Sequence, residues 1–167
     1  EKMIERYWEE KAGKLLLLGD ILYHGPRNDL PRDYAPKRVI EMLNNMREQL
    51  LCIRGNCDCE VDQMVLQFPI MADYAALWLN GHMVWATHGH VYNMDNHPPF
   101  QKGDILLHGH THIPAAQQFE DGFYYIKPGS VSIPKAGSRN SYLVLEGSTF
   151  TLKAIEDGSV ISSFTVE

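Results

Sequence analysis

Side chains that bind metals recur at the ends of four short apolar runs of this sequence. The four segments are Gly19-Asp20, Gly55-Asn56-Cys57-Asp58, His88-Gly89-His90 and Gly109-His110-Thr111-His112. Carboxylate and amide oxygens with imidazole nitrogens form a mixed ligand set that suits divalent transition metals, and the glycines allow tight turns and close backbone approach. We therefore predict a metal site built from Asp20, Asn56, His88, His110 and His112.

The spacing of the last two histidines adds a geometric expectation. In an extended segment residues i and i+2 point to the same side, so His110 and His112 are predicted to project together. A lone histidine at a strand end is more often a surface or hydrogen-bonded residue, and we interpret His24, His82 and His97 in that way.

The segments that must position these residues alternate between strand and helix. Apolar runs predict strands over 14–18, 51–54 and 104–107 and a hairpin of 76–79 with 82–87 around Asn80-Gly81. Helical spacing predicts a first helix that ends at Gly13, a second over 36–50 and a weaker third over 61–67. Asp-Gly and Glu-Gly pairs after residue 120 indicate an antiparallel meander. The pattern predicts an α/β sandwich with polar loops at the carboxyl ends of its strands.

The length and net charge of the chain limit the classes of protein to which it can belong. The chain has 167 residues with 44% hydrophobic content, enough for a core and suited to a single domain over residues 1–167. Its formal charge is −6 and its basic residues are scattered, so a nucleic-acid polymer is not expected as a substrate. The longest purely apolar run, 15–18, is far shorter than the roughly 20 residues of a membrane span, so no membrane association is expected.

Three cysteines, Cys52, Cys57 and Cys59, form no disulfide framework and favour a reducing cytoplasm. Their C-x4-C-x-C spacing lacks the usual zinc-thiolate pairs, so core packing of Cys52 is the better interpretation. Cys57 as a nucleophile has no neighbouring base that the sequence can place.

The four segments, in order and spacing, resemble the calcineurin-like metallophosphoesterase superfamily. Within it the chain is most similar to the bacterial YfcE-type phosphodiesterases, through residues 24–28, 34–36, 55–58 and 128–135. The resemblance runs from the first helix to the C-terminus and implies a calcineurin-like sandwich of β-sheets flanked by helices.

The resemblance also implies roles for the ligands. Asp20 would bridge two metals, Asn56, His88 and His110 would bind the second, and His112 would bind the first. In this family an Asp-x-His motif ends a strand just before the first helix, and no such motif stands before the first helix of this sequence. We expect that strand and its two ligands upstream of Glu1.

Two further residues are candidates for catalysis. Cys57 stands where much of the superfamily has a histidine thought to assist the leaving group, and cysteine is usual in the YfcE-like branch. His90 either supports a ligand or contacts phosphate, with a structural hydrogen bond as the alternative. For Arg27 the sequence leaves open phosphate binding and a surface position.

The resemblance implies a phosphodiesterase that hydrolyses a small phosphodiester. Two metal ions about 3.5 to 4 Å apart would lower the pKa of a bridging water and neutralise the phosphoryl oxygens. Manganese is the expected metal, with iron, zinc and nickel as alternatives. A phosphomonoesterase is one alternative function, and a non-catalytic scaffold is another, because the family includes a retromer subunit. The sequence leaves open the substrate and the oligomeric state, a homo-oligomer included.

Overall fold

The computed structural model describes residues 1–167 and contains three α-helices, one short 3-10 helix and ten strands. The helices are α1 (Lys2–Glu9), α2 (Pro36–Asn45) and α3 (Glu60–Val65), with the 3-10 turn η1 at Arg47–Gln49. The strands are β1 (Leu15–Leu17), β2 (Leu50–Cys52), β3 (Tyr74–Leu79), β4 (His82–Thr87), β5 (Ile105–His108), β6 (Pro114–Gln118), β7 (Tyr124–Pro128), β8 (Ser141–Glu146), β9 (Thr149–Ala154) and β10 (Val160–Thr165).

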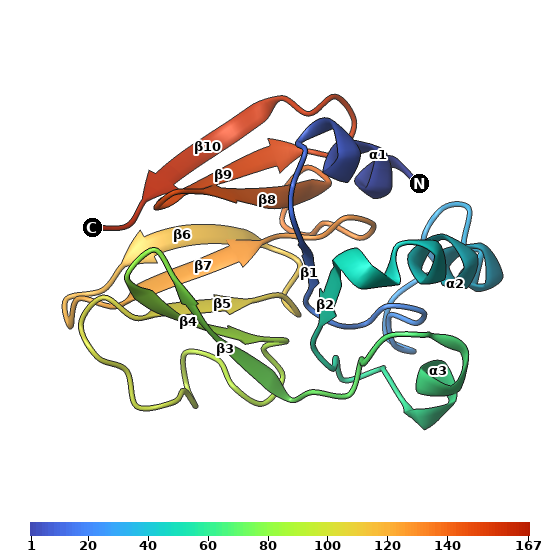
Figure 1. The fold of residues 1–167 in the computed structure, drawn as a ribbon, viewed down its shortest axis with the longest axis horizontal. Coiled ribbons are helices and arrows are strands. Elements are labelled where there is room, and N and C mark those ends of the chain that lie inside the picture. Colours follow the sequence, from blue (N-terminus) through green and yellow to red (C-terminus); the bar gives the residue numbers. More distant parts are fainter.

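The strands form three sheets. β1 and β2 pair in parallel, β3-β4-β5-β7-β6 form a mixed five-stranded sheet, and β10-β9-β8 form an antiparallel three-stranded sheet. A buried cluster joins the two larger sheets, with Val84, Ile105 and Ile126 on one side and Phe150 and Val166 on the other. The predicted α/β sandwich is therefore confirmed (Figure 1).

A second core lies on the helical side of the molecule. It brings together α1, α2, β2 and the segment after α3, through the buried side chains of Tyr7, Leu22, Leu43, Met46, Cys52, Leu66, Phe68 and Ile70. The β1–β2 pair lies between the five-stranded sheet and helices α2 and α3 (Figure 1). Its strands thus end at the junction of the two halves. No helix combines the length and apolar character needed to traverse a lipid bilayer.

The first helix ends earlier than predicted. Lys11 takes the left-handed conformation (φ 51°), and the N–H groups of Lys11 and Ala12 donate to the carbonyls of Trp8 and Tyr7. This is the Schellman pattern of a helix C-terminus, with lysine at the position that glycine usually fills. The expectation that Gly13 ends the helix is wrong, because these two hydrogen bonds satisfy the last carbonyls first.

The second half of the chain is also not one antiparallel meander. β6 and β7 form an antiparallel hairpin, but β7 pairs in parallel with β5 and so extends the five-stranded sheet. Tyr124 and Ile126 on β7 are buried, as expected for an inner strand. Only β8 to β10 form the separate meander.

Candidate metal centre

The loops that follow β1 and β2 are held together by one buried carboxylate. The side chain of Asp58, 2% exposed, accepts hydrogen bonds from the backbone N–H groups of Asp20 at 2.8 Å, Ile21 at 2.9 Å and Gly55 at 2.6 Å. A carboxylate that accepts several backbone N–H groups makes strong, charge-assisted bonds. Asp58 thus fixes the loop that carries Asp20. No role was predicted for it, although it lies in the same four-residue segment as Asn56.

Glycine is required where these two loops meet. A Cβ atom on Gly55 would lie 2.1 Å from the Asp20 carboxylate, and one on Gly19 would lie 2.4 Å from the Gly55 nitrogen. Asp20 itself has φ 56°, and its Oδ1 accepts the N–H of Cys57 at 2.9 Å. The backbone therefore determines where the second carboxylate oxygen, Oδ2, lies.

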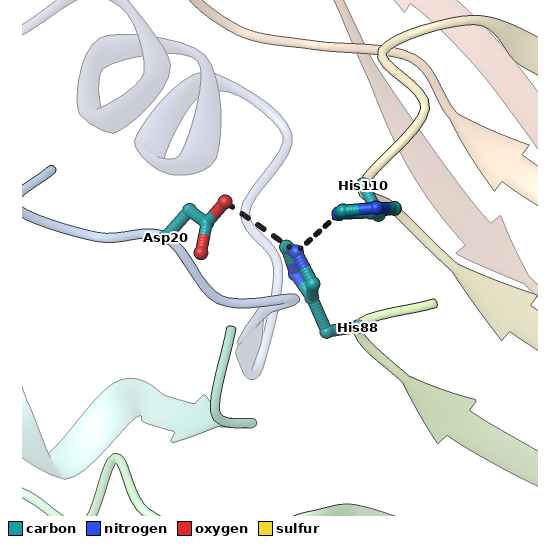
Figure 2. Close-up of side chains that lie close together, drawn as sticks. All are labelled: Asp20, His88 and His110. Atoms are coloured by element: carbon teal, nitrogen blue, oxygen red, sulfur yellow. Dashed lines mark hydrogen bonds and ion pairs between the residues drawn. The ribbon is translucent and has the colours of Figure 1, made fainter. Parts of the chain in front are cut away.

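His88 lies at the end of β4 and presents one defined nitrogen to this carboxylate. Its Nδ1 donates to the carbonyl of Leu18 at 2.5 Å, which leaves the lone pair of the neutral ring on Nε2. That Nε2 atom lies 3.4 Å from Asp20 Oδ2, 3.1 Å from Asn56 Oδ1 and 3.1 Å from His110 Nδ1. Asp20 and His110 lie on two sides of His88 in Figure 2.

Asp20 and His110 are in the protonation states that bind a cation, whereas the Asp20 carboxylate favours the protonated form of His88. Burial raises the pKa of Asp20, but the hydrogen bond and charge of His88 outweigh burial, and the net pKa is lowered. The pKa of His110 is lowered by burial and by neighbouring His88, so its ring is neutral at pH 7. Burial lowers the pKa of His88, but Asp20 and the Leu18 carbonyl outweigh burial, and the net pKa is raised.

One shared proton cannot form hydrogen bonds with all the ligand atoms of this cluster. Ligand atoms of Asp20, His88 and His110 all lie within 4.8 Å of one another, and the amide oxygen of Asn56 faces the same nitrogen of His88. A shared proton can form a hydrogen bond between only two of these atoms at a time. A divalent cation can be coordinated by all of them at once. The residues therefore fit a divalent metal ion with mixed nitrogen and oxygen ligands.

His112 approaches the same region without joining the cluster. Its Nδ1 donates to the carbonyl of Ile133 at 2.8 Å, so Nε2 carries its lone pair, and burial lowers its pKa. His110 and His112 have φ values of 62° and 60°. The expectation of an extended segment is wrong, because both residues are left-handed. Both histidines nonetheless line one cavity.

That cavity has a volume of about 380 Å³ and a polar wall. Four of the predicted ligands form one part of it: Asp20, Asn56, His110 and His112. Residues 24–28 with Thr111 and Lys135 form the rest, so Pro26 is the one hydrocarbon side chain. His24, interpreted from the sequence as a surface or hydrogen-bonded residue, thus lies beside the site, and its buried Nε2 has no hydrogen-bond partner.

The two residues proposed for catalysis lie near the cluster but outside the cavity wall. Burial, together with the charges of Asp20 and Asp58, raises the pKa of the Cys57 thiol to about 11, which favours the protonated thiol at neutral pH. His90 is exposed, and its ring centre lies 5.3 Å from that of His88. The part of its ring that is shielded from solvent and the neighbouring His88 both lower its pKa. The catalytic roles of both residues stay predictions.

Several other histidine and cysteine predictions concern structure. Cys52 packs in the helical core, as expected. His82 Nδ1 lies 2.8 Å from the carbonyl of Gly103, and His97 stacks on Phe100 with ring centres 4.5 Å apart. These contacts agree with the structural interpretation of both histidines.

Comparisons with known proteins agree with this architecture. A family profile described as the calcineurin-like phosphoesterase superfamily domain matches residues 1–149. Phosphodiesterase YfcE of Escherichia coli strain K12 is 42% identical over 166 residues, which cover 99% of this chain and 90% of that protein. The solved structure of Yfce, a phosphoesterase from E. coli, matches with a TM-score of 0.95 at 41% identity, over 99% of this chain and 91% of the other.

A more distant structure shares the fold alone. Vps29 from Chaetomium thermophilum matches with a TM-score of 0.55 at 15% identity, over 94% of this chain and 84% of the other. Together the matches confirm the expected calcineurin-like fold and the resemblance to the YfcE-type branch.

Proposed function

This chain belongs to the calcineurin-like phosphoesterase superfamily, and from that premise we propose that it is a metal-dependent phosphodiesterase acting on a small phosphodiester. One observation carries the proposal: Asp20 Oδ2, Asn56 Oδ1 and His110 Nδ1 all lie within 3.4 Å of Nε2 of His88. The E. coli relative is named a phosphodiesterase, which supports diesters over monoesters.

The proposed cofactor is a pair of divalent ions. The mixed oxygen and nitrogen ligands suit manganese, iron, zinc or nickel, and the family resemblance favours manganese. When bound, such ions supply Lewis acidity that lowers the pKa of a water molecule and neutralises phosphoryl oxygens. Asp20 would be shared between the ions, Asn56, His88 and His110 would hold one, and His112 would contribute to the other.

The surrounding chain supports this function by fixing each ligand before a metal arrives. The carbonyls of Leu18 and Ile133 hold His88 and His112 in the tautomer that presents Nε2. Hydrogen bonds from a ligand's second nitrogen orient the ring and raise its basicity. Asp58 holds the backbone on both sides of Asp20, and an ionised Asp20 can share its two oxygens.

The proposed substrate is a small molecule and the proposed compartment is the cytoplasm. A cavity of about 380 Å³ accommodates a small alcohol, and the net charge of −6 disfavours a nucleic-acid polymer. The three cysteines are free thiols, which suits a reducing compartment.

Hydrolysis of bis-p-nitrophenyl phosphate tests the proposal. We expect activity that disappears on thorough chelation and returns best with manganese, and that exceeds activity on p-nitrophenyl phosphate. His97→Ala, outside the site, is the matched control for His88→Ala: it should retain activity that His88→Ala loses. Activity that persists after chelation contradicts the metal mechanism. Metal binding without turnover of either ester would favour the scaffold alternative.

A further inference from the structure

Two cationic side chains line the cavity beside the metal ligands and have no partner of their own. Arg27 belongs to the loop after β1, and Lys135 to the loop after β7, so they come from distant parts of the chain. Both are exposed, and neither takes part in a salt bridge or side-chain hydrogen bond with the protein. Asp20 is the one acidic residue in the cavity wall, and it belongs to the metal centre.

This local charge is opposite to that of the whole chain. The protein carries −6, yet the cavity wall outside the metal ligands carries two positive charges and no negative one. A cavity lined by charges of one sign raises the local concentration of ligands of the other sign. Unpaired guanidinium and ammonium groups are also the side chains that bind phosphate and carboxylate.

A neutral donor completes the wall. Thr111 stands between two predicted ligands, and its hydroxyl oxygen accepts a hydrogen bond from Lys127 Nζ at 3.0 Å. Lys127 is only 9% exposed, and its Nζ also lies 5.3 Å from the centre of the Tyr125 ring. Because a hydroxyl has a single proton and its oxygen here is already an acceptor, the proton of Thr111 is free to be donated to a ligand.

From this wall, and resting on the function proposed above, we propose that the cavity binds the second alcohol of the diester and selects alcohols that carry a further negative charge. The charge would be a carboxylate or a second phosphate, held by Arg27 and Lys135. An apolar alcohol would find no apolar surface apart from Pro26, and a cationic alcohol would be repelled.

A set of p-nitrophenyl phosphodiesters with one leaving group tests this selectivity. The second alcohol is glycolate (anionic), ethanol (neutral) or choline (cationic). For the manganese-loaded wild type we expect kcat/KM to fall in that order, by about tenfold or more between glycolate and choline, as expected for electrostatic steering. Arg27→Gln and Lys135→Gln should each reduce this ratio several-fold. Lys37→Gln, an exposed lysine on α2 with the same change of charge, should leave the ratio as it is.

A binding measurement separates the cavity from catalysis. Isothermal titration of the metal-free protein with inorganic phosphate should show binding that weakens in Arg27→Gln and Lys135→Gln and stays at the wild-type level in Lys37→Gln. Phosphate binding that is equal in all four proteins would overturn the proposal.

The outcomes also distinguish the two proposals. If the wild type hydrolyses all three diesters at equal kcat/KM, the selectivity is refuted and the phosphodiesterase function stands. If both variants lose activity equally on all three diesters, the cations contact the reacting phosphoryl group and the selectivity is again refuted. If none of the diesters is hydrolysed, the phosphodiesterase function itself fails.

Discussion

The metal cluster and the cavity wall beside it are built in opposite ways. In the cluster, His88 is buried and is held by the Leu18 carbonyl, and the Asp20 loop is held by Asp58. In the wall, Arg27 and Lys135 are exposed and have no partners. The difference indicates a division of labour: the cluster is preorganised for one chemistry, whereas the wall can adapt to the group that it binds.

The cluster is also a junction between the two halves of the fold. Asp20 and Asn56 follow the β1–β2 pair, whereas His88 and His110 follow strands of the five-stranded sheet (Figures 1 and 2). The hydrogen bond from His88 to the Leu18 carbonyl connects these halves directly. Changes in the cluster should therefore affect activity strongly, and changes to its supports should affect both activity and stability.

The largest expected effect comes from breaking the cluster at Asp20. Asp20→Asn removes a negative oxygen that the proposed function assigns to both ions, whereas Asn56→Ala removes one neutral amide oxygen. We expect Asp20→Asn to lower kcat/KM by more than the roughly 100-fold that loss of a supporting partner costs, and Asn56→Ala to lower it less. The measurement is hydrolysis of bis-p-nitrophenyl phosphate with manganese, alongside circular dichroism. Equal losses in two folded variants would show that Asp20 is not shared.

The second-largest effect is expected from Asp58, whose carboxylate holds the Asp20 loop but is not itself a predicted metal ligand. Asp58→Asn keeps the shape of the side chain but replaces one acceptor oxygen by an N–H₂ group that faces backbone N–H donors. We expect a loss of about 2 to 4 kcal/mol in the free energy of unfolding, typical of a broken buried charge network. Activity should fall by about 10- to 100-fold at saturating manganese.

Urea unfolding and a manganese titration of activity test this second prediction. Asp95→Asn makes the same change at an exposed loop position and should alter neither quantity. Wild-type stability and manganese dependence in Asp58→Asn would show that the loop around Asp20 holds its shape without the carboxylate.

The sequence predicted the positions of these regions better than their geometry. Strands and their polar ends were predictable because apolar runs stop at glycine and ligand-type residues, as at Gly19-Asp20 and Gly109-His110. Convergence of Asp20 with His88 followed from the expectation that polar loops gather at the carboxyl ends of strands, although the two strands belong to different sheets. The parallel pairing of β7 with β5 was not predictable, because local alternation does not specify the partner of a strand.

The supports of the site depend on contacts between residues far apart in the sequence. Asp58 binds the backbone of residues 37 and 38 positions away, and Lys127 reaches Thr111 across 16 positions. The left-handed conformations of His110 and His112 were not predictable, because neither position holds a glycine, the residue that usually marks such a conformation. Such features appear only when the folded chain brings their partners together.

The smallest predicted effect lies in a third region, far from both the cluster and the wall. Glu10, just after α1, accepts hydrogen bonds from Tyr142 on β8, at 2.7 Å, and from Lys153 on β9. Burial raises the pKa of Glu10, but the bonds from Lys153 and Tyr142 outweigh burial and lower it on balance. The contact thus fastens the first helix to the three-stranded sheet.

Glu10→Gln should therefore destabilise the protein by about 1 kcal/mol at pH 7, the scale of a partly exposed ion pair. A carboxyl whose pKa is lower in the folded state stabilises it above the unfolded value of about 4.3 and loses that contribution as the pH falls through the folded value. The stability difference between wild type and Glu10→Gln should accordingly shrink below pH 4. Urea unfolding from pH 7 to pH 3 measures this difference. Glu9→Gln is the smaller control, because the Glu9 side chain is 59% exposed and pairs with Arg6 within the same helix. Diesterase activity should be unchanged in both variants, because neither residue touches the metal centre or the cavity. A stability difference that stays constant down to pH 3 would show that Glu10 acts by packing and not by charge.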